Sequence, residues 1–323
     1  MAIGLPLISV IIPTYNRAPF VCEAIDSVFS QTFTDYEIIV VDDGSTDSTK
    51  EVLEKYQDKI KYIYQENSGV SAARNAGIKN STGSWLAFLD SDDKWMPQYL
   101  STQVEWVRRF PDICMQTTDC YCCRTASEEN KRTYFEMNRV IKEFKRQDYL
   151  LLTDPFRFVV MHGPWQVGST IFYRDAIKKA GLFDTNLGLN EDFDLMARMA
   201  LQGPFGVIRN ALVVMYRRNE TIACLTSQVK THPIQARELY EKIYEKLRSI
   251  ETLKGLEREA VSRLMGMNRR AIGNLLLMTG SVDEARESYR QAFFIDRSLR
   301  SLGKYFLSFF PTNINQWIIE KRQ

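Results

Sequence analysis

Three carboxylates are crowded at the end of an apolar run, in the segment Trp85–Asp93. The run Trp-Leu-Ala-Phe-Leu is too short for a helix and predicts a buried strand, which Asp90-Ser91-Asp92-Asp93 follows directly. Carboxylates this close repel one another unless a positive charge lies between them. Oxygen ligands suit Mg²⁺ or Mn²⁺, which often complete their shell with substrate phosphates. The segment therefore predicts a metal and diphosphate site; the alternative is an acidic turn that begins a helix.

Strands and helices alternate through the first third of the chain, and these elements must position the carboxylates. Apolar runs predict strands at residues 7–12, 37–41, 59–64 and 85–89, each followed by a helical pattern. Near-continuous apolar runs are typical of strands buried on both faces of a parallel sheet. Four such alternations predict an α/β domain with a mostly parallel central sheet.

Polar clusters directly follow three of these predicted strands. They are Thr14-Tyr15-Asn16, Asp42-Asp43 and Asp90–Asp93. In open α/β sheets, ligands bind outside the carboxyl ends of the strands. Three clusters at one edge favour the ligand site over the acidic turn, although we expect Asp93 itself to begin the next helix.

The rest of the chain divides into two parts of different character. We expect strands at 113–118, 166–173 and 211–216, helices at 174–180 and from Glu191, a polar insertion at 127–146 and a short helix at 147–152. After about residue 226 the sequence is strongly helical, and one stretch resembles a single tetratricopeptide-like helix pair, too little for a repeat protein. These patterns predict a first domain over 1–225 and an α-helical region over 226–323.

Composition excludes several classes of protein. A hydrophobic content of 45% and a charged content of 25% are typical of globular domains. The net charge of +2, without a long basic tract, gives no reason to expect a nucleic-acid partner. There is no apolar run of about 18 residues and no secretory signal. Six cysteines without zinc-site spacing predict reduced thiols and a cytoplasmic protein.

Taken in order, the motifs resemble those of the family 2 glycosyltransferases, which are inverting enzymes with a GT-A fold. The resemblance covers roughly residues 5–220. Its segments are Val10–Asn16, Val40–Ser45, Gly69–Gly77, Phe88–Asp93 and Gly181–Asp184 with Glu191-Asp192. It implies a GT-A domain followed by a helical appendage. It also implies transfer of a hexosyl or N-acetylhexosaminyl unit, and only one, because the Q-x-x-R-W signature and membrane helices of processive synthases are absent.

The same resemblance implies a role for each candidate residue. Asp90 and Asp92 match the D-x-D motif that binds Mn²⁺ or Mg²⁺ with the donor diphosphate, and Asp192 matches the catalytic base. The nucleotide-diphosphate sugar would be bound by Pro13, Thr14, Tyr15, Asp42, Asp43, Arg74 and Ser91. These roles are chemically coherent, because a cation neutralises the diphosphate leaving group and a base within reach of the acceptor hydroxyl takes its proton.

One position departs from the family pattern. Asn219 stands where many relatives carry a His that joins the metal or diphosphate site. Its neutral amide binds such groups only through dipoles. A third contact at this site is therefore left open.

The sequence leaves alternatives open for the acceptor and for the class of function. We expect a glycan or lipid-linked acceptor, and the aromatic C-terminus, Tyr305–Phe310 with Trp317–Ile319, either packs on the domain or contacts the inner face of a membrane. A non-catalytic module that binds nucleotide sugar or glycan is the alternative function. A nucleotide-dependent oxidoreductase is disfavoured, since no G-x-G-x-x-G follows the first strand.

Overall fold

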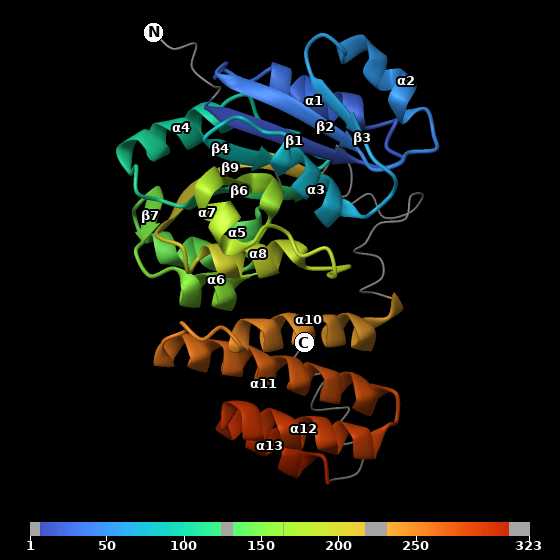
Figure 1. Cartoon of the computed structure of the whole chain (residues 1–323). Helices are drawn as coiled ribbons and strands as arrows, with labels where there is room; N and C mark the ends of the chain where they lie inside the picture. Colours follow the sequence, from blue (N-terminus) through green and yellow to red (C-terminus); the bar gives the residue numbers. More distant parts are fainter. Residues whose placement is uncertain (1–6, 124–131, 164, 217–230, 310–323) are drawn as a thin grey trace. The chain divides into compact units, whose positions relative to one another are not determined.

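The structure, a computed structural model, describes residues 7–123, 132–163, 165–216 and 231–309. The chain forms two compact units, Met1–Ile222 and Ala223–Gln323 (Figure 1). This division and the expected boundary at residue 225 both fall within 217–230, outside the described residues. The exact boundary therefore stays a prediction.

The first half of the sheet is parallel. Strands β1 (Ile8–Thr14), β2 (Tyr36–Asp42), β3 (Lys61–Tyr64) and β4 (Trp85–Phe88) lie in the order β3-β2-β1-β4. All pairings among these four strands are parallel. Every residue of β1 and β4 is buried, which explains their continuous apolar sequences. The four predicted strands and the α/β class are thus confirmed.

The second half of the sheet is mixed. It contains β5 (Lys94–Trp95), β6 (Met115–Cys123), β7 (Tyr149–Leu152), β8 (Thr170–Tyr173) and β9 (Phe205–Tyr216). β8 is antiparallel to β4 and to β6, whereas β6 and β9 are parallel. β5 and β7 both pair antiparallel with β9.

Two local predictions in this half are wrong. The expected helix at 147–152 is strand β7, because pairing with the first half of β9 outweighs the helical propensity of its leucines. Asp93 does not begin a helix, since β5 follows it directly.

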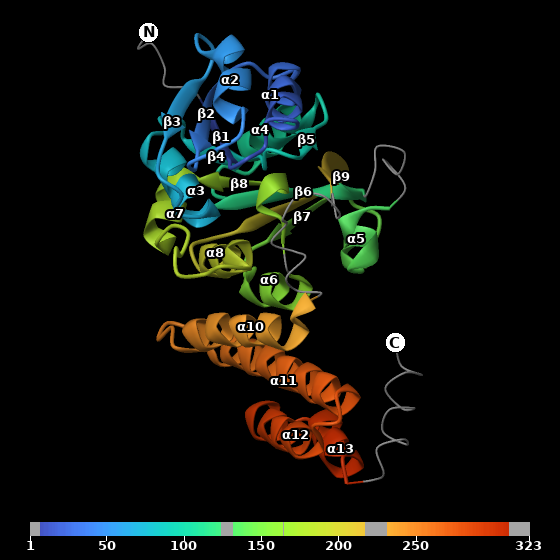
Figure 2. The same cartoon turned by 90° about the vertical axis from the view of Figure 1, so that its right-hand side faces the viewer.

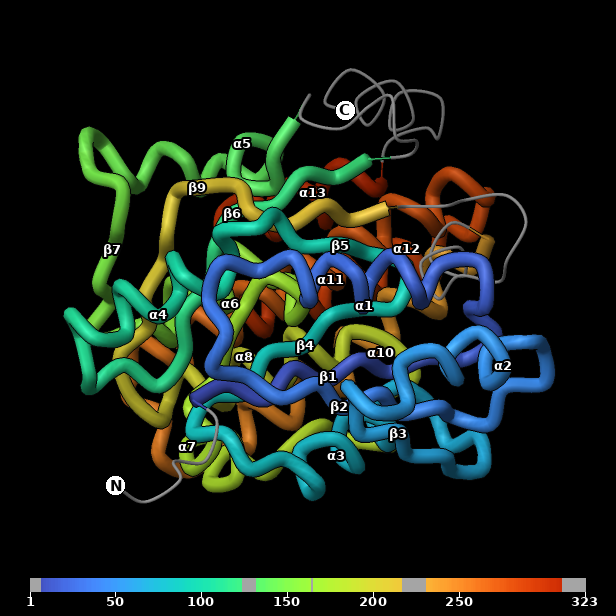
Figure 3. Tube along the Cα trace, turned by 90° about the horizontal axis from the view of Figure 1, so that it is seen from above, coloured from blue at the N-terminus to red at the C-terminus, as the bar shows by residue number. Residues whose placement is uncertain are grey.

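Helices α1 (Val21–Phe29) and α3 (Val70–Lys79) lie on opposite sides of β1 and β2 (Figures 2 and 3). α3 packs closely on β1, because a Cβ at Gly77 would lie 2.3 Å from Cγ2 of Ile11. The other α-helices in the described part of this unit are α2 (Thr49–Leu53), α4 (Tyr99–Arg109), α5 (Tyr134–Met137), α6 (Phe156–His162), α7 (Arg174–Ala180) and α8 (Glu191–Met199).

The described part of the polar insertion, from residue 132, is not merely a polar surface segment. Tyr134 and Phe135 of α5 are buried, and Phe144 of the following 3-10 helix (Val140–Phe144) is buried as well. The backbone N–H of Phe135 donates to Oδ1 of Asp119 on β6, at 2.9 Å. A few aromatic side chains therefore hold this segment on the sheet.

The second unit is helical, as expected. Its described residues, 231–309, form α10 (Pro233–Arg248), α11 (Gly255–Met278), α12 (Val282–Asp296) and α13 (Leu299–Leu307), each packed on the next. α11 and α12 approach closely, because a Cβ at Gly273 would lie 2.6 Å from the ring of Tyr289. None of the helices described is both long and apolar enough to cross a membrane.

Candidate active site

The polar ends of β1, β2 and β4 come together at one edge of the sheet. Thr14 and Asp42 are partners across β1 and β2, and the N–H of Asp43 donates to the carbonyl of Thr14 at 2.9 Å. On the other side of β1, the N–H of Leu89 donates to the carbonyl of Ile11 at 3.0 Å. Asp90 therefore emerges at the same edge, beside the end of β1.

The two carboxylates after β2 are buried and hydrogen-bonded within the protein. Asp42 Oδ1 accepts from the N–H of Ser45 at 2.9 Å, and Oδ2 accepts from the Tyr62 hydroxyl at 2.8 Å. Two acceptor positions of Asp42 are thus used, out of about four that a carboxylate offers.

Asp43 is engaged more completely. Its Oδ1 accepts from Gln65 Nε2 at 2.6 Å and from the N–H of Ser68 at 2.9 Å. Its Oδ2 accepts from the N–H of Gly69 at 2.8 Å. These bonds fix the loop before α3, where Gly69 has φ +86°. The structure thus gives Asp43 an architectural role.

The segment after β1 is tied to the segment after β2. Asn16, at φ +51°, accepts from the N–H of Thr46 at 2.8 Å through Oδ1, and its own N–H donates to Ser45 Oγ at 2.9 Å. Between these fixed points the Tyr15 side chain is 44% exposed, whereas Pro13 and Thr14 are buried. Tyr15 is therefore the residue of this segment most available to a ligand.

Arg74 on α3 joins two motifs that are distant in sequence. Its Nη2 donates to Asp90 Oδ1 at 2.9 Å, and its Nη1 donates to Glu191 Oε1 at 2.7 Å. The guanidinium is buried and lies over the Phe183 ring, 5.3 Å from its centre. A buried cation between two carboxylates offsets their repulsion. Arg74 thereby fixes the D-x-D segment relative to the first turn of α8.

Asn75, the next residue on α3, holds the segment that leads to α8. Its Nδ2 donates to the carbonyl of Phe183 at 2.8 Å, and its Oδ1 accepts from the N–H of Phe183 at 3.0 Å. From the other side, Arg198 of α8 donates to the carbonyl of Leu182 at 2.7 Å. Side chains on two helices thus define the path of this loop.

Asp192 is the candidate base, in the first turn of α8. Its pKa is raised to about 7, first by burial of the carboxyl and second by the negative charge of Glu191, and Arg74 opposes the shift. Asp192 Oδ1 also accepts from the N–H of Phe193 at 2.7 Å. The pKa places its proton exchange near neutral pH, where a general base is most effective. This result differs from the low pKa that a helix N-terminus alone would give.

The D-x-D carboxylates are accessible, in contrast to those after β2. The side chains of Asp90 and Asp92 are 38% and 29% exposed, and Arg17 Nε lies 3.6 Å from Asp92 Oδ2. Ser91 between them is buried. Asp93 accepts from the N–H of Tyr216 at 2.8 Å and so ties the end of β9 to this segment.

The described residues contain no group of three or more His, Cys, Asp or Glu side chains that could hold a metal ion on their own. Two accessible carboxylates nonetheless fit Mg²⁺ or Mn²⁺ in the mode in which substrate phosphates and water complete the shell. Asn219 lies outside the described residues, so the third contact stays a prediction.

The structure divides the predicted site residues into those that lie together and those that do not. Asp90, Arg74 and Asp192 come together, while Asp43 is turned toward the loop before α3. Sequence reasoning assigned no role to Glu191, Asn75 or Phe183, although all three lie in quoted motifs. Their partners are more than a hundred residues away, so local sequence carries no signal for these contacts.

Relatives of this chain are glycosyltransferases by name. Residues 9–163 match the family model described as Glycosyl transferase family 2. An uncharacterised glycosyltransferase of Rickettsia typhi is 33% identical over 190 residues, which cover 59% of this chain and 57% of that protein. TuaG of Bacillus subtilis, named as a teichuronic acid biosynthesis glycosyltransferase, is 42% identical over 106 residues, covering 32% of this chain and 42% of that protein.

Solved structures share the fold at low sequence identity. S. aureus TarS 1-349 in complex with UDP-GlcNAc has a TM-score of 0.63 at 18% identity, covering 98% of this chain and 92% of that one. The mannosyltransferase PcManGT of Pyrobaculum calidifontis, in complex with GDP-Man and Mn²⁺, has a TM-score of 0.57 at 18% identity, covering 97% and 84%. Residues 9–163 therefore match glycosyl transferase family 2, and they lie within a domain that has the GT-A fold.

Proposed function

We propose that this protein is a metal-dependent, inverting glycosyltransferase that adds one sugar from a nucleotide-diphosphate sugar to a hydroxyl of a glycan or lipid-linked acceptor. The observation that carries the proposal is the Arg74 bridge, because it joins Asp90 of the D-x-D motif to Glu191, next to Asp192. A diphosphate site and a base are thereby held together. The name of TuaG supports cell-surface polysaccharide assembly as the setting.

Asp90 and Asp92 are the residues that would hold Mn²⁺ or Mg²⁺ in this proposal. The bound cation supplies Lewis-acid neutralisation of the diphosphate leaving group. Arg74 fixes the orientation of Asp90, since it donates to only one of the two carboxylate oxygens. Asp42 and Tyr15 would contact the nucleotide: Asp42 retains acceptor capacity and Tyr15 is exposed at the same edge.

Asp192 would take the acceptor proton. The acceptor oxygen attacks the anomeric carbon on the face opposite the diphosphate, and the bond to the diphosphate breaks with its electron pair left on the phosphate oxygen. The acceptor O–H proton passes to the Asp192 carboxylate. This step inverts the anomeric centre and needs no covalent intermediate on the protein.

The test compares Asp192→Asn with Asp175→Asn, an exposed aspartate on α7, as the matched control. Transfer is measured with a panel of UDP- and GDP-sugars and Mn²⁺, and donor binding is measured by thermal shift. Loss of a positioned base costs about 10²–10⁴-fold in turnover. We expect this loss for Asp192→Asn alone, with donor binding retained. An active Asp192→Asn protein would contradict the assignment.

The same assay separates the enzyme from the alternative, a non-catalytic binding module. Such a module would show a donor-induced thermal shift in the wild type without transfer or hydrolysis under any metal condition. Removal of metal by EDTA, with restoration by Mn²⁺ or Mg²⁺, tests metal dependence independently of the base.

The pH dependence gives a further test of Asp192. Its pKa of about 7 predicts that kcat falls about tenfold per pH unit below 7, because the protonated carboxyl cannot act as base. Stability changes in the opposite direction: a raised folded-state pKa favours folding at low pH, and this contribution is lost as pH rises from about 4 to about 7. Asp192→Asn should therefore raise the melting temperature at pH 8 and leave it unchanged at pH 4.

A further inference from the structure

Two neighbouring carboxylates in the first turn of α8 have different partners. Glu191 is 8% exposed, and its Oε1 accepts from Arg74 Nη1 at 2.7 Å. Asp192 is partly buried, and its Oδ1 accepts from the N–H of Phe193 at 2.7 Å. Among the residues that the structure describes, no Lys, Arg or His side chain forms an ion pair with Asp192. The buried cation beside this turn is thus held by Glu191 and not by the candidate base.

Arg74 still has N–H donors to offer. A guanidinium has five of them, and Arg74 gives one to Asp90 and one to Glu191. Its Nε is buried and has no hydrogen-bond acceptor among the described residues. The charge of Arg74 already acts on Asp192, because it lowers the pKa of that carboxyl. A guanidinium released from Glu191 therefore has Asp192 as the neighbouring carboxylate in the same helical turn.

Pairing with Arg74 would make Asp192 a weaker base. A cation next to a carboxylate lowers its pKa by about 1–3 pH units, and a general base is most effective when its pKa lies near the working pH. The pKa of Asp192 is about 7, first because the carboxyl is buried and second because Glu191 is negative. The opposing effect of Arg74 is smaller than that of Glu191, and Asp90 adds a smaller rise. Glu191 thus outweighs Arg74 at the candidate base.

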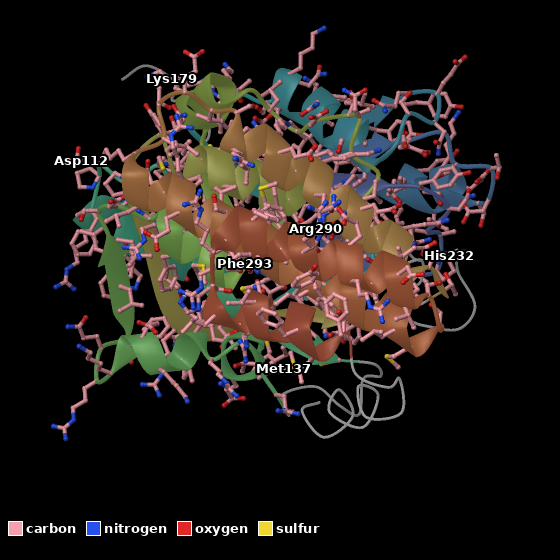
Figure 4. All side chains as sticks on the ribbon, turned by 90° about the horizontal axis from the view of Figure 1, so that it is seen from below. Asp112, Met137, Lys179, His232, Arg290 and Phe293 are labelled. Carbon is pink, nitrogen blue, oxygen red and sulfur yellow. The ribbon has the colours of Figure 1, made fainter. Side chains whose placement is uncertain are left out.

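The other charged groups on the helices around Asp192 do not take over this role. On α8 itself, Asp194 is paired with Arg198 at 2.6 Å. Arg174 of α7 donates to a backbone carbonyl at 3.2 Å, and burial lowers the pKa of His162 on α6. The remaining charged residues of α3, α6 and α7 are exposed, and the last of them is labelled in Figure 4: Lys79, Arg157, Asp175, Lys178 and Lys179.

The ion pair is not required to join α3 to α8. Asn75 already ties α3 to the loop before α8 through two hydrogen bonds with Phe183, and Arg198 holds the same loop at Leu182. A buried salt bridge adds little net stability, since the desolvation of both charges offsets their attraction. A role of the charge of Glu191 in the chemistry therefore explains its position better than a role in stability.

We propose that Glu191 is a positioning residue, which holds the Arg74 guanidinium away from Asp192 and so keeps the candidate base without a cationic partner. Glu191 acts through Arg74 and takes no proton itself in the transfer. The inference rests on the proposed function, because only a base gains from the lack of a cation. The electrostatic effect is present in the protein without donor or metal, so it can be measured separately from transfer.

The experiment measures the protonation of Asp192 in the full chain without metal or donor. Carboxyl-carbon NMR of isotope-labelled aspartate is followed across the neutral pH range, and the Asp192→Asn variant assigns the signal. Glu191→Gln removes the charge but keeps an acceptor oxygen for Arg74 Nη1. Asn75→Ala is the matched control, because it breaks another link between α3 and α8 and leaves every charge in place. Circular dichroism and the melting temperature verify folding.

We expect the midpoint of the Asp192 titration to fall by at least about one pH unit in Glu191→Gln and to keep its wild-type value in Asn75→Ala. Glu191→Asp keeps the charge on a shorter side chain, so its midpoint should lie between those of the wild type and Glu191→Gln. This variant carries the test if Glu191→Gln does not fold. In the transfer assay, the acid limb of kcat should move with the midpoint.

A double variant tests the route through Arg74. In an Arg74→Met background no guanidinium is left to turn toward Asp192, so Glu191→Gln should lower the midpoint by clearly less than it does alone. Equal lowering in both backgrounds would overturn the proposal, as would wild-type midpoints in Glu191→Gln and Glu191→Asp. An equal fall in Asn75→Ala would also overturn it, because the loop would then be the cause. If the midpoints follow the proposal but Asp192→Asn still transfers sugar, the proposed function fails and the positioning of Arg74 stands.

Discussion

The ends of β2 and β4 have the same sequence pattern, but their carboxylates lie in different environments. Each is a buried apolar strand followed by closely spaced carboxylates. After β2, Asp42 and Asp43 are 1% and 4% exposed, and protein donors occupy both oxygens of each. After β4, Asp90 and Asp92 keep 38% and 29% of their side chains exposed, and arginines are their partners.

The kind of partner explains this difference. The backbone N–H groups of Ser68 and Gly69 cannot move away from Asp43 without disrupting the loop before α3. Three of the about four acceptor positions of Asp43 therefore hold this loop, and its contact with the nucleotide stays a prediction. An arginine side chain supplies positive charge as well as N–H donors, so a metal ion can share or replace that charge at a carboxylate. An accessible carboxylate whose partners are charged side chains is therefore a candidate metal ligand.

The contrast between the two strand ends can be tested by substitution. The largest effect on turnover is expected for Asp90→Asn. Loss of a metal-binding carboxylate removes several kcal/mol of leaving-group stabilisation, or at least about 100-fold in turnover. The amide still accepts from Arg74, so the free energy of unfolding should change by less than about 1 kcal/mol. Steady-state transfer rates and urea unfolding measure the two quantities. A protein that unfolds easily yet turns over normally would reverse the roles given to the two strand ends.

Asp43→Ala should lower the free energy of unfolding. It removes three hydrogen bonds to a carboxylate and leaves the N–H groups of Ser68 and Gly69 without their acceptor, which costs about 3 kcal/mol of unfolding free energy. Asp43→Asn is the matched control, because it keeps one acceptor oxygen and should lose less. Urea unfolding at constant m-value measures both. If both variants unfold like the wild type, the architectural role of Asp43 is wrong.

The smallest effect on stability and on turnover is expected for Arg17→Gln. Arg17 and Asp92 are partly exposed and their charged atoms lie 3.6 Å apart. Exposed ion pairs of this kind contribute about 0–1 kcal/mol. Thermal unfolding should barely change, while metal-dependent turnover should not decrease. A loss of stability as large as that of Asp43→Ala would remove the distinction between the two strand ends.

The sequence predicted the strands and their polar ends because those signals are local. A buried strand is visible in five to seven consecutive residues, and the motifs follow it directly. The orientation of Asp43 was not predictable, because its donors come from Gln65, Ser68 and Gly69 on a separate loop. Strand β7 was assigned as a helix because only pairing with β9 distinguishes it. The burial of Ser301 on α13 was not predictable either, because its partner Arg270 comes from another helix.

The contacts that Arg74 and Asn75 make also set the order in which the site can be assembled. They close loops of 117 and 108 residues, and contacts between residues so far apart in sequence form slowly because of the loop-closure entropy. β1 and β4 can pair once the chain has passed Asp90, but Asp192 reaches its place only after α8 has been synthesised and has docked on α3. The segment that matches the family model ends at residue 163, before that helix begins. In terms of the proposed function, a nascent chain therefore acquires the carboxylates proposed to bind the metal first and the proposed base last, so we expect a chain that lacks α8 to show no transfer.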